Sequence, residues 1–153
     1  MRVSVIGGSQ CTDRGARRGA AVGRELAERG HDLVCGGLGG VMEHACRGAS
    51  EAGGHTIGIL PGPDRGAANP HVHTAVVTGM GSARNVLVVL NGDAVIAVEG
   101  ATGTLSELGH ALDLGRPVAG LDTHQIDGLA GVEHVDSAGA AVEHVENALE
   151  GSP

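Results

Sequence analysis

The chain has 153 residues and a formal net charge of -8, and all ten of its basic residues are arginine. This length is typical of one domain, and we expect residues 1–153 to form a single domain. The absence of lysine excludes enzymes that form a Schiff base on a lysine and those that use a Walker-type phosphate loop. The acidic charge argues against nucleic-acid partners, whose phosphates are neutralised by clustered Lys and Arg.

The cysteines and the start of the sequence predict a cytoplasmic protein with reduced thiols. Cys11, Cys35 and Cys46 show no CxxC spacing, and the sequence opens on a strand-like run instead of a signal segment. No apolar run reaches the roughly 20 residues that a membrane span needs, so we expect no membrane partner. The lysine-free, acidic composition suits a cytoplasm of high salt, although a GC-rich coding sequence would remove lysine equally well.

Strand-like and helix-like segments alternate along the first half of the sequence. Short apolar runs that end at glycine, proline or a glycine turn predict strands at 2–7, 32–35 and 55–60. Between them, apolar residues recur at helical spacing over about 13–29 and over 41–52. The 28 glycines fall between apolar runs, as tight strand-to-helix turns require, and this favours an α/β fold.

The second half begins with a loop over 61–70 that is rich in Gly, Pro and Asp. The alternation then continues, with strands at 72–77, 93–98, 118–121 and 132–135 and helices at 82–90, 104–114 and 138–149. Strands that are apolar throughout predict a parallel sheet covered on both faces. We therefore expect an α/β fold, a three-layer Rossmann-like domain with a mainly parallel sheet of about six to seven strands and helices on both faces.

The segment EGATGTLSE follows a predicted strand end, where ligands bind to parallel sheets. It places Gly100, Thr102, Gly103 and Thr104 at a helix start, where free amides and the positive end of the helix dipole face an anion. This pattern indicates a phosphate site, although the same residues could merely cap the helix. Glu107 either pairs with Thr104 as a cap or projects into the cleft.

Three more segments at the same edge carry candidate ligand-binding residues. Arg84, at the start of a predicted helix, would aim its guanidinium along this edge unless it is an ordinary surface arginine. Asn85 beside it could supply an amide contact. The further candidates are Gly8 and Ser9 after the first strand, Gly36, Gly37, Gly39 and Gly40 after the second, and Met80 after the fourth.

The histidines do not make a convincing metal site. His71 and His73, spaced i,i+2 on a predicted strand, would share one face, but no HExxH motif or third ligand accompanies them. We therefore expect no metal. The sequence also lacks Phe, Tyr and Trp, so a ligand ring must lie against aliphatic side chains, peptide planes or arginine.

Three motifs in order, GGLGGVM, MGSARN and EGATGTLSE, resemble the LOG-like family of Rossmann-fold nucleotide-binding proteins, the so-called lysine decarboxylases. The family patterns are GGG-x-x-G-L-M, M-x-x-R-K and PGGxGTxxE, and the resemblance covers roughly residues 2–121. Glu99, Ala101 and Asn85 depart from it, standing where the family has Pro, Gly and Lys. With these departures the sequence looks more like the sister branch that includes molybdenum-cofactor carrier-like proteins.

The resemblance implies two functions. In the first, the protein is a nucleoside 5′-monophosphate phosphoribohydrolase, with Arg84 and Glu107 catalytic and Gly103 and Thr104 holding the phosphate. In the second, it binds or carries a nucleotide or the molybdenum cofactor without turnover. Neither requires a cofactor for catalysis, and the partner is a small phosphorylated ligand. The missing lysine rules out a lysine decarboxylase. The resemblance also implies a homo-oligomer, a dimer or tetramer.

Glu99 poses a question of its own, because a carboxylate beside a bound phosphate is repulsive. It must either point away from the phosphate or hold a metal. The sequence leaves both open.

Overall fold

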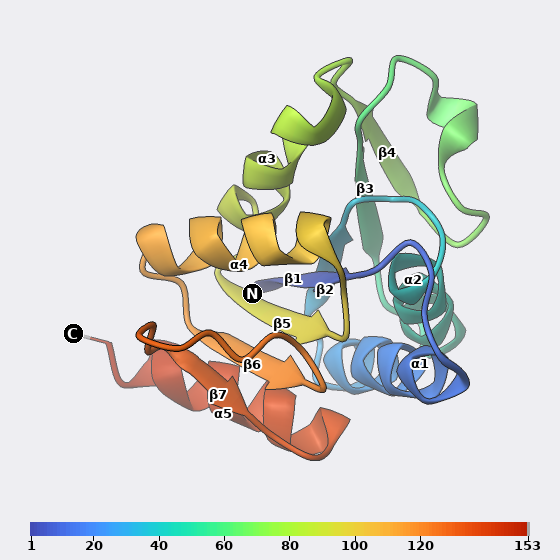
Figure 1. Cartoon of the computed structure of the whole chain (residues 1–153). Coiled ribbons are helices and arrows are strands. Elements are labelled where there is room, and N and C mark those ends of the chain that lie inside the picture. The colour runs from blue at the N-terminus through green and yellow to red at the C-terminus, as the bar shows by residue number, and fades with distance from the viewer. Residues whose placement is uncertain (153) are drawn as a thin grey trace.

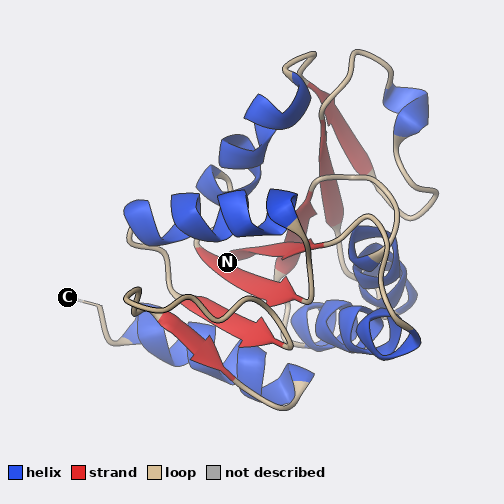
Figure 2. Cartoon of the chain, viewed as in Figure 1, coloured by secondary structure: helices blue, strands red, loops and turns tan. Residues whose placement is uncertain are grey.

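The computed structural model describes residues 1–152 and contains one sheet with helices on both faces (Figure 1 and Figure 2). The strands are β1 (Arg2–Gly7), β2 (Asp32–Cys35), β3 (Thr56–Leu60), β4 (Thr74–Val77), β5 (Ala94–Val98), β6 (Val118–Leu121) and β7 (Val132–His134). The helices are α1 (Asp13–Glu28), α2 (Val41–Glu51), α3 (Asn85–Leu90), α4 (Thr102–Asp113) and α5 (Ala138–Glu150), with 3-10 turns η1 (Arg65–Ala67) and η2 (Gly81–Arg84).

The sheet runs β4-β3-β2-β1-β5-β6-β7, and every neighbouring pair in it is parallel. The predicted α/β fold with a sheet of six to seven strands is therefore confirmed. The chain builds outward from β1 to β4 on one side and then returns to add β5, β6 and β7 on the other. This reversal between β1 and β5 is the switch point at which parallel sheets open a crevice for ligands.

Two layers of helices bury the sheet, one on each face. Helices α1, α2 and α5 pack on one face, and α3 and α4 pack on the other (Figure 1). In β1, Val3 and Val5 join the core of the first layer, whereas Ile6 joins that of the second. Strands buried on both faces have no polar side to show in the sequence, which explains their unbroken apolar runs.

Some glycines lie inside helices instead of in turns. A Cβ at Gly23 of α1 would lie 1.9 Å from the Ala45 carbonyl oxygen of α2, and one at Gly48 would lie 2.0 Å from the Ala20 oxygen. In each helix, a glycine therefore packs in direct contact with the backbone of the other helix. The prediction that the glycines fall between apolar runs, where turns need them, does not hold for Gly23 and Gly48, because close helix packing also requires a residue without a Cβ.

The element boundaries differ from the expected ones at a few places near the site. Helix α4 begins at Thr102, two residues earlier than predicted, because the turn ends at Gly100 with φ +113°. The predicted helix 82–90 is divided into η2 and α3. Strand β4 begins only at Thr74, so His71 and His73 lie in the preceding segment and not on a strand.

Candidate functional site

A cavity of about 290 Å³ opens at the carboxyl ends of β1, β2 and β5, at the switch point of the sheet. Four segments far apart in the sequence meet there. Its walls are Gly7, Gly8, Ser9, Leu38, Met42, Arg84, Asn85, Ala101, Thr102, Gly103, Thr104 and Glu107.

The first turn of α4 presents unpaired backbone donors to this cavity. Ala101 stands at the N-cap without a side-chain hydrogen bond, and its carbonyl accepts from Leu105 N at 3.0 Å. Within residues 1–152, the amides of Thr102, Gly103 and Thr104 have no hydrogen-bond partner. The first turn of a helix leaves such donors free, and the helix dipole adds positive potential there. This end of the cavity suits an anion.

Arg84 lines the same cavity and is buried, with 9% of its surface exposed. Its Nε donates to the Ile59 carbonyl at 2.9 Å and its Nη2 to the Gly36 carbonyl at 3.4 Å. A Cβ at Gly36 would lie 2.7 Å from Nη2, so glycine is required for this approach. Burial lowers the pKa of Arg84, an effect that Glu107 opposes. The guanidinium is a fixed positive group and not a surface side chain.

Glu107 lines the same cavity and is 7% exposed. Its carboxyl group has no hydrogen-bond partner and no ion pair within 4 Å among residues 1–152, so it does not pair with Thr104 as a cap. Burial raises its pKa to about 7, against the opposing effect of Arg84. The carboxyl group therefore exchanges its proton near neutral pH, as a general acid or base must.

A chain of hydrogen bonds joins Arg84 to the first turn of α4. Arg84 Nη1 donates to Asn85 Oδ1, Asn85 Nδ2 donates to Ser106 Oγ at 3.1 Å, and Ser106 Oγ donates to the Gly103 carbonyl at 2.7 Å. Asn85 thus links two walls of the cavity through both ends of its amide. Sequence reasoning overlooked Ser106, although it lies within EGATGTLSE.

Glu99 directly precedes the turn that leads into α4, but its side chain points out of the cavity. Its Oε1 accepts from Thr12 N at 3.1 Å and from Thr12 Oγ1 at 2.6 Å, at the N-terminus of α1. Of the two expectations for Glu99, the structure has the one in which the carboxylate points away. No group of three or more His, Cys, Asp or Glu side chains within residues 1–152 is arranged to hold a metal ion.

The structure places the candidate residues in two groups. Those in the cavity wall are Gly8, Ser9, Arg84, Asn85, Thr102, Gly103, Thr104 and Glu107. Those outside it are Gly36, Gly37, Gly39, Gly40, Met80 and Gly100. Leu38 and Met42, which sequence reasoning did not select, form the apolar part of the wall, and Met42 is the last residue of the motif GGLGGVM.

Two glycines outside the cavity wall pack directly against residues of the wall. A Cβ at Gly40 would lie 2.2 Å from the Gly8 carbonyl oxygen, so the turns after β1 and β2 pack backbone against backbone. A Cβ at Gly100 would lie 2.4 Å from the Thr104 side chain. Met80 is 47% exposed on the turn before η2. A ligand role for these residues stays a prediction.

The sequence model of the SLOG cluster4 family matches residues 1–149. The chain belongs to the SLOG cluster4 family. The predicted LOG-like membership is thereby confirmed. An uncharacterized protein of Archaeoglobus fulgidus is 43% identical over 121 residues, which are 79% of this chain and 80% of the relative.

Two kinds of named protein are similar to this SLOG cluster4 chain. Cytokinin riboside 5'-monophosphate phosphoribohydrolase LOG of Oryza sativa subsp. japonica is 37% identical over 116 residues, covering 70% of this chain but only 46% of that protein. The molybdenum cofactor binding protein of Rippkaea orientalis matches with a TM-score of 0.87 and 34% identity, over 97% of this chain and 95% of the other. The Moco carrier protein of Chlamydomonas reinhardtii matches with a TM-score of 0.88 and 32% identity, over 97% of both chains.

The fold of the SLOG cluster4 chain extends to more distant proteins. DNA processing protein A of Streptococcus pneumoniae matches with a TM-score of 0.75 at 22% identity, over 93% of this chain and 60% of that one, which shows a shared fold alone. The expected absence of nucleic-acid partners stays a prediction. No helix within residues 1–152 is long and apolar enough to cross a membrane.

Proposed function

We propose that this SLOG cluster4 protein binds a phosphorylated heterocyclic compound of the molybdopterin or nucleotide type and carries it without turnover. The observation that supports this most directly is the meeting, in one cavity, of three unpaired helix amides with the buried Arg84 and Glu107. The ligand's phosphate would accept hydrogen bonds from Thr102, Gly103 and Thr104. Amide donors and a helix N-terminus favour an anion without requiring lysine.

The charges of Arg84 and Glu107 are compatible with a bound phosphate group. Arg84 supplies a permanent positive charge that nearby carbonyl groups hold in place. Because burial raises its pKa to about 7, Glu107 is partly protonated at neutral pH, and the protonated form does not repel a phosphate. A protonated carboxyl group also donates a hydrogen bond that a carboxylate cannot.

The ring of the ligand would lie on Leu38 and Met42, because the sequence has no aromatic side chain on which a base could stack. A volume of about 290 Å³ is at the lower end of the range for small-molecule sites. Part of a pterin or nucleoside would therefore remain in solvent. Incomplete burial suits a carrier, since a carrier must release its ligand to a second protein.

The full-length similarity to molybdenum cofactor proteins supports the carrier proposal over hydrolysis. It spans nearly the whole of both chains at 32–34% identity, whereas the matched part of the plant phosphoribohydrolase is less than half of that protein. The proposal also suits the departures from the phosphoribohydrolase pattern at Glu99 and Ala101.

Thr102 allows a test of the phosphate contact that does not disturb the helix. Thr102 is the first residue of α4, where proline is well tolerated, so Thr102→Pro removes one amide donor and Thr102→Ala keeps it. The assay measures retention of molybdenum cofactor released from a molybdoenzyme, by gel filtration and pterin fluorescence. We expect the wild type and Thr102→Ala to retain it and Thr102→Pro to lose about tenfold in affinity. Equal retention by the wild type and both variants, or none by the wild type, would contradict the proposal.

The unpaired Glu107 favours one second candidate, hydrolysis of the N-glycosidic bond of a nucleoside 5′-monophosphate. Glu107 would act on the ribose carbon as a base for water or as a stabiliser of an oxocarbenium-like state, while the α4 amides hold the 5′-phosphate. A panel of nucleoside monophosphates should then yield free base and ribose 5-phosphate, with a rate that rises with pH through about 7 as Glu107 ionises. No release from any nucleotide, or full activity in Glu107→Ala, would exclude it.

A further inference from the structure

The backbone around Glu99 has an unusual conformation for a residue with a side chain. Glu99 has φ +50°, in the left-handed region that normally favours glycine, and it directly precedes Gly100 and Ala101 in the turn that leads to the α4 amides. A non-glycine residue persists in this region only where its surroundings stabilise it. The contacts of Glu99 must therefore be strong enough to offset that strain.

Those contacts come from three sides. The carboxylate accepts from Thr12 N at 3.1 Å and from Thr12 Oγ1 at 2.6 Å and 2.9 Å from its two oxygens. The Glu99 carbonyl accepts from Thr123 Oγ1 at 2.8 Å, and the Glu99 amide donates to the Leu121 carbonyl at 3.0 Å. Both the side chain and the backbone of Glu99 are held.

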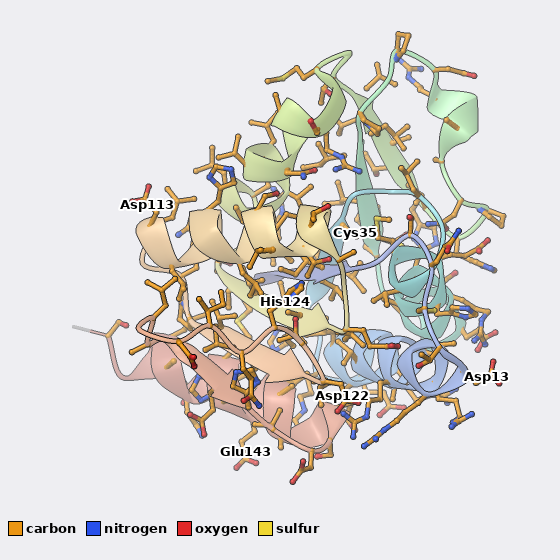
Figure 3. All side chains as sticks on the ribbon, viewed as in Figure 1. Asp13, Cys35, Asp113, Asp122, His124 and Glu143 are labelled. Carbon is orange, nitrogen blue, oxygen red and sulfur yellow. The ribbon has the colours of Figure 1, made fainter. Side chains whose placement is uncertain are left out.

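A fourth contact holds the next part of the same turn. His124 Nε2 lies 2.9 Å from the Ala101 carbonyl, to which it can only donate. In Figure 3, His124 lies on the segment that follows β6, near the end of β5 and the start of α4. The turn 99–101 is thus tied to α1 on one side and to the segment after β6 on the other.

We infer that Glu99 is a positioning residue that fixes the phosphate-binding turn in its binding geometry before a ligand arrives. This inference rests on the proposed phosphate site. The Glu99 carboxylate lies at the N-terminus of α1, where the helix dipole stabilises a negative charge, so the charge is directed away from the cavity. A turn that is already ordered loses less conformational entropy when it binds phosphate.

Gly15 provides an independent way to break the contact. The three atoms nearest to a Cβ built at Gly15 all belong to the Glu99 carboxylate, the closest at 1.9 Å. The change Gly15→Ala therefore expels the carboxylate from α1 while leaving Glu99 in the sequence. It does so with a residue that favours helix more than glycine does. Its effect on phosphate binding separates displacement of Glu99 from weakening of α1.

The sign of the effect distinguishes positioning from simple charge. If Glu99 acted only as a nearby negative charge, both Glu99→Ala and Glu99→Gln would strengthen the binding of an anion. A positioning role predicts that Glu99→Ala weakens it about five- to tenfold. Glu99→Gln keeps an acceptor for Thr12 and should bind at least as well as the wild type.

The experiment measures guanosine 5′-monophosphate affinity by calorimetry in wild type, Glu99→Ala, Glu99→Gln, Gly15→Ala and the double variant Glu99→Ala/Gly15→Ala. Glu28→Ala, which removes an exposed carboxylate from α1, is the matched control and should leave affinity unchanged. The two alanine variants should each weaken binding. The double variant should bind no more weakly than Glu99→Ala, because the carboxylate that a methyl group at position 15 would displace is already absent. Equal or tighter binding by Glu99→Ala would overturn the inference.

A ligand-free readout keeps this test separate from the proposed function. Backbone order parameters of residues 100–104 should be near 0.85 in the wild type and fall toward 0.6 in Glu99→Ala and Gly15→Ala. Unchanged order parameters would refute the positioning role whether or not the nucleotide binds. A second outcome separates the two proposals. If the wild type binds neither the nucleotide nor the cofactor, but the order parameters are lower in Glu99→Ala and Gly15→Ala than in the wild type, the proposed function fails and the positioning role stands.

Discussion

Replacing Glu107 by glutamine should make the protein more stable at alkaline pH and leave its stability in acid almost unchanged. The Glu107 side chain is buried with no hydrogen bond or ion pair among residues 1–152, and burial raises its pKa to about 7 from the ordinary 4.5. Between pH 4.5 and pH 7, Glu107 therefore keeps its proton in the folded protein but has lost it in the unfolded chain. The resulting stability is fully present below pH 4.5 and is lost as the pH rises through 7.

The magnitude follows from the two pKa values. Each tenfold difference in proton affinity corresponds to about 1.4 kcal/mol, so ionisation of Glu107 costs the fold about 3 kcal/mol above pH 8. Glutamine has nearly the same shape and carries no charge to desolvate. The difference in unfolding free energy between Glu107→Gln and the wild type should therefore rise from near zero at pH 4.5 to about 3 kcal/mol at pH 8.5.

Urea unfolding from pH 4.5 to 9, followed by circular dichroism, measures this difference. The control is Glu143→Gln, because the Glu143 side chain extends from α5 into solvent (Figure 3). Its difference from the wild type should be small at every pH. A Glu107→Gln difference that does not increase between pH 4.5 and 8 would contradict a Glu107 that is buried without a compensating partner.

Three further predictions concern the framework of the site. Glu99→Pro restores the residue of the LOG-like family pattern, yet it should destabilise the protein by about 2 kcal/mol or more in urea unfolding. Proline cannot adopt φ +50° and has no N–H to donate to the Leu121 carbonyl. A variant as stable as the wild type would contradict the left-handed conformation of Glu99. Gly23→Ala should cost about 1–3 kcal/mol through its clash with α2, whereas Gly109→Ala, which meets open space, should be neutral or stabilising. Ser106→Ala should weaken calorimetric guanosine 5′-monophosphate binding about three- to tenfold by breaking the link from Asn85 to Gly103, and unchanged affinity would exclude that link from the site.

The sequence contained most of the information about the fold, because parallel strands buried on both faces are apolar runs bounded by glycine. The pattern DAVIAV, followed by a glycine turn and a helical segment, predicts β5 and α4 from neighbouring residues alone. The turns at the carboxyl ends could be brought to one edge by the general geometry of parallel sheets. This geometry predicts Arg84 and Glu107 at one edge of the sheet, although the sequence alone left open whether Glu107 caps the helix or projects into the cleft.

The remaining features depend on contacts between residues far apart in the sequence. The direction of Glu99 is determined by Thr12, 87 residues away, and no local pattern indicates a left-handed glutamate. The glycines at 36 and 40 resemble ligand-binding glycines, yet they lie behind the wall because Arg84 and Gly8 need the space. Their neighbour Leu38 lines the cavity instead.

The central claim is that the first turn of α4 binds the phosphate of a heterocyclic ligand. The most direct test is an NMR titration of the ¹⁵N-labelled protein with guanosine 5′-monophosphate and, separately, with guanosine. If these amides bind the phosphate, the nucleotide should shift the amide signals of Thr102, Gly103 and Thr104 in a saturable way, and guanosine at the same concentration should not. Equal shifts with guanosine, or saturation without any change at these three amides, would contradict it.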